Sequence, residues 1–178
     1  MNECTTLPRI CGRTILRRLT DTDLMRFQAY RQDPEVARFQ GWDQMTDQEA
    51  LSFIQGARYS KLMTPGSWSQ IGIAERSSGK LIGDVGIFIN SGEDEAEIGF
   101  SLHRHYQRQG LAREAVREAI NLIFERTTVD RIIGITDDRN LASIKLLKAM
   151  GMKKMTSLDT IFRGEACTEL TFSVLRNS

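Results

Sequence analysis

The stretch EIGFSLHRHYQRQGLA (residues 97–112) decides the fold of this 178-residue chain. Ile98, Phe100 and Leu102 alternate with polar or small residues, and this period of two predicts a strand with one buried face. After Gly110 the apolar residues recur every three or four positions, which predicts a helix. A strand, a glycine turn and a helix N-terminus leave free backbone N–H groups that favour an anion, above all a phosphate. We therefore expect a phosphate-bearing cofactor.

Further strands and helices extend from this stretch in both directions. The helix is expected over 110–125, a buried strand over 131–136, and a second helix over 140–150 that ends at a left-handed Gly151. Because a strand–helix–strand crossover is right-handed, the strands at 97–102 and 131–136 should be parallel neighbours. The remaining expected elements are strands at 14–19, 68–74, 81–89, 153–162 and 165–175 and helices at 21–32 and 46–61, the last beginning with the capping box TDQE.

Composition limits the classes of protein that the chain can represent. The length suits one domain, 1–178, and the net charge of +1 gives no general attraction to nucleic acid or an anionic membrane. No apolar run is long enough to span a membrane, and no signal peptide is evident. Cys4, Cys11 and Cys167 lack metal or redox spacing, and His103 and His105 are too few for a histidine-rich metal site. We expect a cytoplasmic protein that uses no metal.

A second motif, DDRNLAS at residues 137–143, follows the parallel strand and opens the next helix. Together with QRQGLA (107–112), it resembles the GNAT acetyltransferase superfamily, whose pyrophosphate turn reads Gln/Arg-x-x-Gly-x-Gly/Ala and whose later helix starts Asn-x-x-Ser/Ala. The opening TILRRLTDTDL and the EIGF strand are most similar to the Rim-type branch, the ribosomal-protein N-terminal acetyltransferases and their small-molecule relatives. The chain departs from that pattern at His105, where proline is common, and at Met152, where an aromatic residue usually stands.

The resemblance implies an α/β (α+β) fold of GNAT type: a mixed, mostly antiparallel sheet of six to seven strands, with a splayed parallel pair and about four helices. It also implies acetyl-CoA as co-substrate, bound where the parallel strands separate. Backbone groups near Leu102 and His103 would hold the acetyl and pantetheine arm, and a backbone N–H there would polarise the thioester carbonyl. Asn140 would bind the pantetheine arm or simply cap its helix, two roles that can coexist. The residues expected around the pyrophosphate are Gln107, Arg108, Gln109, Gly110, Leu111, Ala112 and Arg113, the two arginines being equally consistent with solvated side chains.

Transfer to an amine needs a base, because an ammonium has no lone pair with which to attack the thioester. Glu97, on the strand that would line the acceptor site, is the first choice for the base, and Asp84 on the neighbouring strand is the second. Both carboxylates are also expected to contact the acceptor. Many relatives use a tyrosine as the acid seven residues after the asparagine, but that position is Leu147 here. Ser143, one helical turn after Asn140, is therefore the expected proton donor or sulfur contact, alone or through a water relay. A solvated strand glutamate and a surface serine are the structural alternatives.

The acceptor should be recognised by the early helices and by the loop at 39–42, where Trp42 either walls an amine pocket or packs as a lid. The chain is expected to bind a protein N-terminus or a small-molecule amine, as a monomer or a homodimer, with no covalent enzyme intermediate. A non-catalytic acyl-CoA-binding or sensory module of the same fold is the alternative function. A dinucleotide-binding oxidoreductase is disfavoured, because its glycine fingerprint is missing after a first strand.

Overall fold

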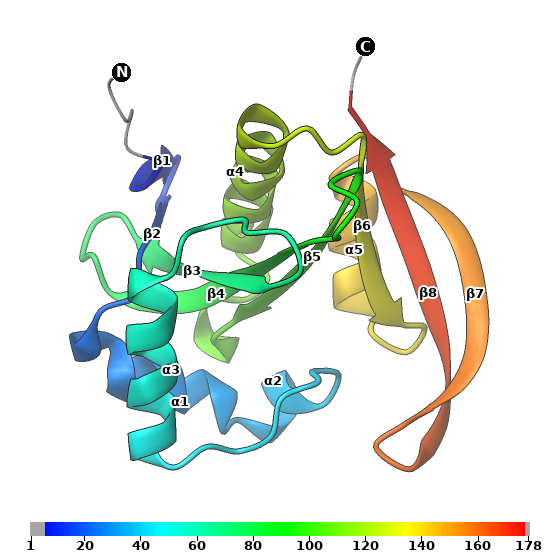
Figure 1. Cartoon of the computed structure of the whole chain (residues 1–178). Coiled ribbons are helices and arrows are strands. Elements are labelled where there is room, and N and C mark those ends of the chain that lie inside the picture. Colours follow the sequence, from blue (N-terminus) through cyan, green and yellow to red (C-terminus); the bar gives the residue numbers. More distant parts are fainter. Residues whose placement is uncertain (1–5, 177–178) are drawn as a thin grey trace.

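The computed structural model describes residues 6–176, which form one eight-stranded sheet with helices on its faces (Figure 1). The spatial order of the strands is β1-β2-β3-β4-β5-β6-β8-β7, and every neighbouring pair is antiparallel except β5 and β6. The strands are β1 (Arg9–Cys11), β2 (Thr14–Arg17), β3 (Trp68–Glu75), β4 (Leu81–Ile89), β5 (Glu95–Leu102), β6 (Arg131–Asp137), β7 (Lys153–Phe162) and β8 (Glu165–Leu175). The α-helices are α1 (Leu24–Arg31), α2 (Pro34–Ala37), α3 (Asp47–Tyr59), α4 (Leu111–Arg126) and α5 (Leu141–Ala149).

The mixed, mostly antiparallel sheet with a parallel pair is confirmed, and the counts of elements need two corrections. The described residues contain eight strands instead of six to seven, because β1 is a three-residue strand that a period of two cannot reveal. They contain five α-helices instead of about four, because α2 is a single turn started by Pro34. Asp33 caps it by accepting a hydrogen bond from the Glu35 N–H at 3.0 Å.

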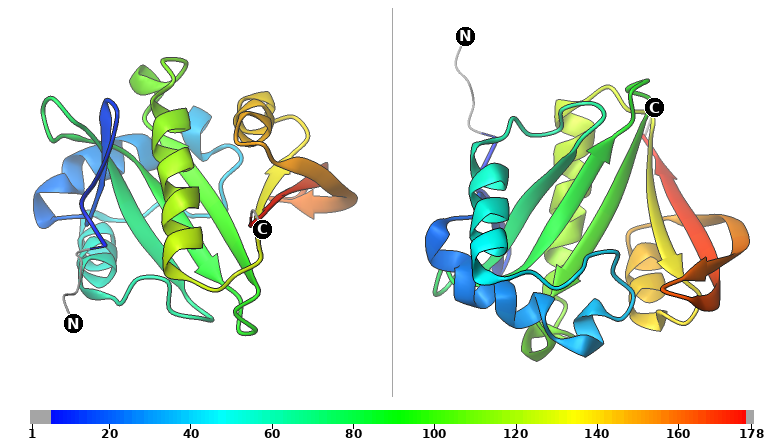
Figure 2. Two further views of the ribbon diagram at one scale, coloured as in Figure 1. Left: turned by 90° about the horizontal axis from the view of Figure 1, so that it is seen from above. Right: turned by 60° about the horizontal axis from the view of Figure 1, so that its bottom comes forward.

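The helices divide between the two faces of the sheet, and each face has its own core. On one face α4 packs its apolar stripe against β2 and β5. On the other face α1 and α3 pack against β3 and β4, where Phe27, Tyr30 and Ile54 are fully buried (Figure 2). Burial of each large aliphatic side chain contributes roughly 1.5–3 kcal/mol. The sheet between β3 and β6 is therefore covered by a buried core on each face.

The capping box expected at the start of the second long helix is confirmed. Thr46 Oγ1 accepts a hydrogen bond from the Glu49 N–H at 3.3 Å, and Glu49 Oε2 accepts one from the Thr46 N–H at 2.8 Å. At the other end of the chain, Gly151 has a φ of 79° directly after α5, as expected of a left-handed helix ending. Local sequence chemistry thus sets these helix boundaries.

The described residues include no helix long and apolar enough to cross a membrane. Cys11 and Cys167 are free thiols, and Cys4 lies outside the described residues.

Candidate active site

The two parallel strands separate after only three paired positions. Glu95–Glu97 of β5 face 131–133 of β6, and beyond this point β5 continues to pair with β4 while β6 pairs with β8. The gap opens into a cavity of about 70 Å³ between β5, β6, α5 and the loop that follows α2. Its lining residues are Phe39, Gln40, Ile98, Gly99, Phe100, Ile135, Thr136, Asn140, Ser143 and Leu147. The structure therefore brings Asn140 and Ser143, which belong to the motif at residues 137–143, beside residues 98–100 of β5.

The turn between β5 and α4 holds a row of unpaired backbone donors. In the described chain, none of the N–H groups of residues 108–113 donates a hydrogen bond, and the first amide of this region to do so is that of Glu114, to Gly110 O at 3.2 Å. Gly110, the N-cap of α4, has a φ of 82°, and Arg108 has a φ of 60°. These two left-handed residues curl the chain so that successive amides precede a 16-residue helix. Such an array binds phosphate oxygens, because both the free donors and the helix dipole attract negative charge.

Arg13, which the sequence reasoning missed, anchors this turn. Its Nη2 donates to Gln109 O at 2.8 Å, and its guanidinium pairs with the Glu114 carboxylate at 2.6 Å. Glu114 Oε2 also accepts the Arg13 N–H at 2.7 Å. The only local signal was the glycine turn at Gly12, and the partner lies about a hundred residues away, beyond the reach of a pattern.

The ladder between β4 and β5 decides which backbone groups face the gap. The His103 N–H donates to Ile82 O at 2.8 Å, so the N–H and C=O groups of odd-numbered residues in β5 face β4. Those of Phe100 and Leu102 face the gap, and Leu102 O there accepts a bond from Gln107 Nε2 at 2.9 Å. The free N–H groups are thus those of Phe100 and Leu102. This corrects the expectation for His103, whose N–H is already paired within the sheet.

The start of α5 places two polar side chains at the cavity. Asn140 Oδ1 accepts a hydrogen bond from the Ser143 N–H at 3.2 Å, which confirms the N-cap role. The Asn140 Nδ2 and the Ser143 hydroxyl make no hydrogen bond within the described residues, so both can serve a ligand. Leu147, by contrast, is buried against Gly134 and belongs to the core. Thr136, a second hydroxyl at the cavity, was missed because it sits within an otherwise apolar strand.

Glu97 lies on β5 between Phe88 of β4 and Ile133 of β6, on the face opposite Ile98. It is half-buried and has no hydrogen-bond or ion-pair partner among the described residues. Burial raises the pKa of its carboxyl above the ordinary glutamate value, and the negative charges of Glu169 and Glu95 raise it further. A carboxylate without a partner and with a raised pKa is suited to accept a proton.

Asp84 lies two strands from β6 and is 1% exposed. Its Oδ2 accepts hydrogen bonds from Arg31 Nη2 at 2.8 Å and from the Tyr30 hydroxyl. Burial, with the Asp84 charge second, raises the pKa of Tyr30 well above its usual value. Asp84 is thus enclosed in a buried ion pair. This pairing favours a structural role for Asp84 over its predicted roles as an acceptor contact and alternative base.

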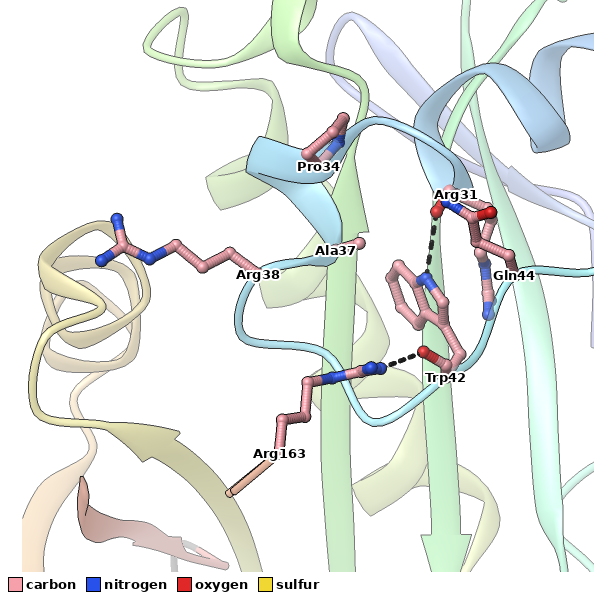
Figure 3. Close-up of a pocket in the computed structure, with 7 residues that line it drawn as sticks. All are labelled: Arg31, Pro34, Ala37, Arg38, Trp42, Gln44 and Arg163. Atoms are coloured by element: carbon pink, nitrogen blue, oxygen red, sulfur yellow. Dashed lines mark hydrogen bonds between the residues drawn. The ribbon is translucent and has the colours of Figure 1, made fainter. Parts of the chain in front are cut away.

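Trp42 lies beside a second cavity of about 220 Å³ (Figure 3). The Arg31 guanidinium stacks 4.0 Å from the centre of the Trp42 ring, and the indole N–H donates to Arg31 O at 3.2 Å. Arg163, at the tip of the β7–β8 hairpin, donates to the carbonyls of Gln40 and Trp42, whereas Arg38 points away from the indole. The hairpin tip thereby holds the loop whose Phe39 and Gln40 line the cavity between β5 and β6. Arg163 had no recognisable signal in the sequence.

Comparison with known proteins identifies the family. The family model described as an acetyltransferase (GNAT) domain matches residues 13–153, most of the chain. The chain belongs to the GNAT acetyltransferase family. An uncharacterized N-acetyltransferase of Bacillus subtilis, YoaA, is 31% identical over 144 residues, which cover 80% of each chain.

Solved structures agree with this assignment of the GNAT fold. A GNAT-family acetyltransferase from Bacillus anthracis superposes with a TM-score of 0.83 at 19% identity, covering 95% of this chain and 98% of that one. A candidate ribosomal-protein-serine acetyltransferase from Vibrio cholerae reaches a TM-score of 0.78 at 26% identity, covering 96% and 98%. This GNAT protein is thus an acetyl-CoA-dependent acetyltransferase that transfers the acetyl group to an amine.

Proposed function

We propose that this enzyme is a Rim-type N-acetyltransferase that acetylates a primary amine, of a protein N-terminus or a small molecule, by direct attack within a ternary complex. The row of unpaired amides at residues 108–113, beside the separated strands, carries the proposal. The similarity at 26% identity to the ribosomal-protein-serine acetyltransferase candidate supports the Rim-type assignment. The protein would work in the cytoplasm and without a metal.

The residues present fit acetyl-CoA. The amides of the turn would hold the pyrophosphate, with Arg108 and Arg113 adding positive charge, and Asn140 Nδ2 would donate to the pantetheine arm. The N–H groups of Phe100 and Leu102 face the gap, where one of them would stabilise the oxyanion that forms from the thioester carbonyl. Each contact uses a group that the fold leaves without a partner.

The remaining roles concern protons. Acetyl-CoA supplies a thioester whose carbon–sulfur bond breaks after the nitrogen–carbon bond has formed. Glu97 would take one proton from the acceptor ammonium, directly or through a water, so that the nitrogen has a lone pair. After attack the nitrogen gives its second proton to water. Ser143, directly or by relaying a proton from water, would deliver one proton to the departing thiolate. No covalent enzyme intermediate is needed, because the acceptor reaches the thioester itself.

The test is acetyl-CoA-dependent thiol release over a panel of N-terminal peptides, polyamines, amino acids and aminoglycosides, with acetyl-CoA affinity measured in parallel by calorimetry. We expect release with one acceptor class, and loss of most of kcat in Glu97→Gln with the acetyl-CoA affinity kept. Glu93→Gln, the same change at an exposed turn residue, is the matched control. Firm acetyl-CoA binding without release from any acceptor would overturn the assigned proton roles and favour the binding module.

A further inference from the structure

Strand β7 is the outermost strand of the sheet, and its outer edge has no partner strand in the described part of the chain. Eight of its ten residues are exposed. They include three large apolar residues, Met155, Leu158 and Ile161, exposed by 49%, 61% and 73%. An edge strand offers a row of free N–H and C=O groups to any second strand of suitable register.

A bulge near the start of β7 brings two opposite charges to the same face. Lys154 pairs with Phe172 of β8, whereas Thr156 pairs with Thr171, so Met155 is the extra residue. Because of this insertion, Lys154 and Asp159 face the same side of the sheet although five positions separate them. Without the bulge the two side chains would lie on opposite faces.

Ser157 lies midway between these charges. On β8, Ser157 pairs with Leu170. Lys154 pairs with Phe172 and Asp159 with Thr168, and each of these partners lies two residues from Leu170. A two-fold axis through Ser157, perpendicular to the sheet, would align two copies of β7 antiparallel and in one continuous sheet. In that register Lys154 of each copy lies directly opposite Asp159 of the other, on the same face.

Both charged side chains are free to make this contact. They are exposed, and neither belongs to an ion pair within the described residues. The Asp159 carboxylate accepts one hydrogen bond, from Thr168 Oγ1 to Oδ1 at 2.9 Å, which leaves Oδ2 available. The edge of β7 is thus self-complementary, because a dimer of two copies would contain two contacts between Lys154 of one copy and Asp159 of the other.

We propose that β7 is a homodimer interface, through which a second copy of this chain pairs antiparallel about Ser157 and extends the sheet to sixteen strands. The two Lys154–Asp159 contacts set the register, and Thr156 lies opposite Leu158 on the other face. The occupant is a second copy because the complementarity is internal to this one strand. The dimer does not depend on the acceptor or on the proton roles assigned above.

The test is the association of charge-reversed variants, measured by sedimentation velocity from low to high micromolar concentration. In a homodimer of Lys154→Asp, each introduced aspartate faces Asp159 of the other copy, and in a homodimer of Asp159→Lys, each introduced lysine faces Lys154. Each change should raise the dimer Kd roughly tenfold to a hundredfold. An equimolar mixture of the two variants restores opposite charges at both contacts and should form a heterodimer with a Kd near that of the wild type.

Lys61→Asp, at an exposed position outside the sheet, is the control for charge reversal as such and should leave the Kd unchanged. Circular dichroism and the thermal midpoint check that every variant is folded. A wild-type protein that stays monomeric overturns the proposal. So does a dimer that neither single variant weakens, or one that the mixture of the two fails to restore.

Discussion

The buried ion pair between Arg31 and Asp84 provides the sharpest prediction about stability. In Asp84→Asn the side chain keeps its shape and can still accept from the Tyr30 hydroxyl, but the negative charge is lost. The Arg31 guanidinium, with its side chain only 8% exposed, then has no counter-charge in the core. Removing one partner of such a pair costs about 3–5 kcal/mol. With about 2–4 °C of Tm per kcal/mol for a chain of this size, Tm should fall by roughly 6–20 °C.

The assay is urea unfolding of the wild type, Asp84→Asn, Arg31→Met and the double variant. Both single variants should be destabilised, and the double variant should lose much less than the sum of the two losses, because no unpaired charge is left buried. Met also retains an apolar contact with Trp42 and Phe27, on whose rings Arg31 stacks. The coupling energy of this cycle isolates the ion pair from the packing.

Activity separates the structural role of Asp84 from a catalytic one. Folded Asp84→Asn, assayed well below its Tm, should keep the wild-type dependence of kcat on pH. A destabilisation under about 1 kcal/mol would refute the reasoning, since it would show that the pair is hydrated rather than buried. A stable variant that has lost kcat would return Asp84 to the chemistry.

Four further substitutions, two of them with a matched control, test the site and the sheet. Glu97→Gln should be more stable than the wild type at neutral pH, because the raised pKa of Glu97 means that its ionised form costs stability. This cost disappears as the pH falls below the ordinary glutamate pKa of 4.5. Urea unfolding at neutral pH and below pH 4.5 measures the difference. The wild-type kcat/KM should correspondingly decline toward acid at a pH above 4.5. Ser143→Ala should lower kcat in steady-state assays with little change in the KM for acetyl-CoA, and an equal rise in KM with kcat intact would contradict the acid role. Gly110→Ala should weaken CoA binding in calorimetry, whereas Gly79→Ala, with a similar φ of 69° in the turn between β3 and β4, should cost stability alone. Gly83→Ala, whose Cβ would lie 2.2 Å from Ser101 O, should cost at least about 1–3 kcal/mol in thermal unfolding, while Gly99→Ala, with no neighbour within 4 Å, should be nearly neutral.

Several features of the site were readable in the sequence because they depend on local chemistry. The alternation that ends at Leu102, the glycine at position 110 and the apolar spacing of α4 specify a strand, a turn and a helix within 30 residues. Asn140 is recognisable for the same reason, since a capping side chain bonds an amide three residues ahead. The positions of these elements could therefore be predicted, while the roles assigned to Glu97 and Ser143 stay predictions.

Other features could not be predicted because they arise from distant contacts. Asp84 looks like a strand carboxylate until α1 places Arg31 and Tyr30 against it. His103 looks as available as Leu102 until the pairing of β4 and β5 uses its N–H.

The sequence by itself determined that this protein has a strand, a glycine turn and a helix in immediate succession, and hence its family resemblance. Backbone hydrogen bonds and side-chain periodicity act over a few residues, so such patterns survive without knowledge of the fold. Only the tertiary structure decided that Arg13 anchors the turn, that Arg163 holds the loop at 39–42 and that a bulge aligns Lys154 with Asp159. Those arrangements depend on strand register and on chain segments far apart in the sequence, which packing of the whole sheet selects.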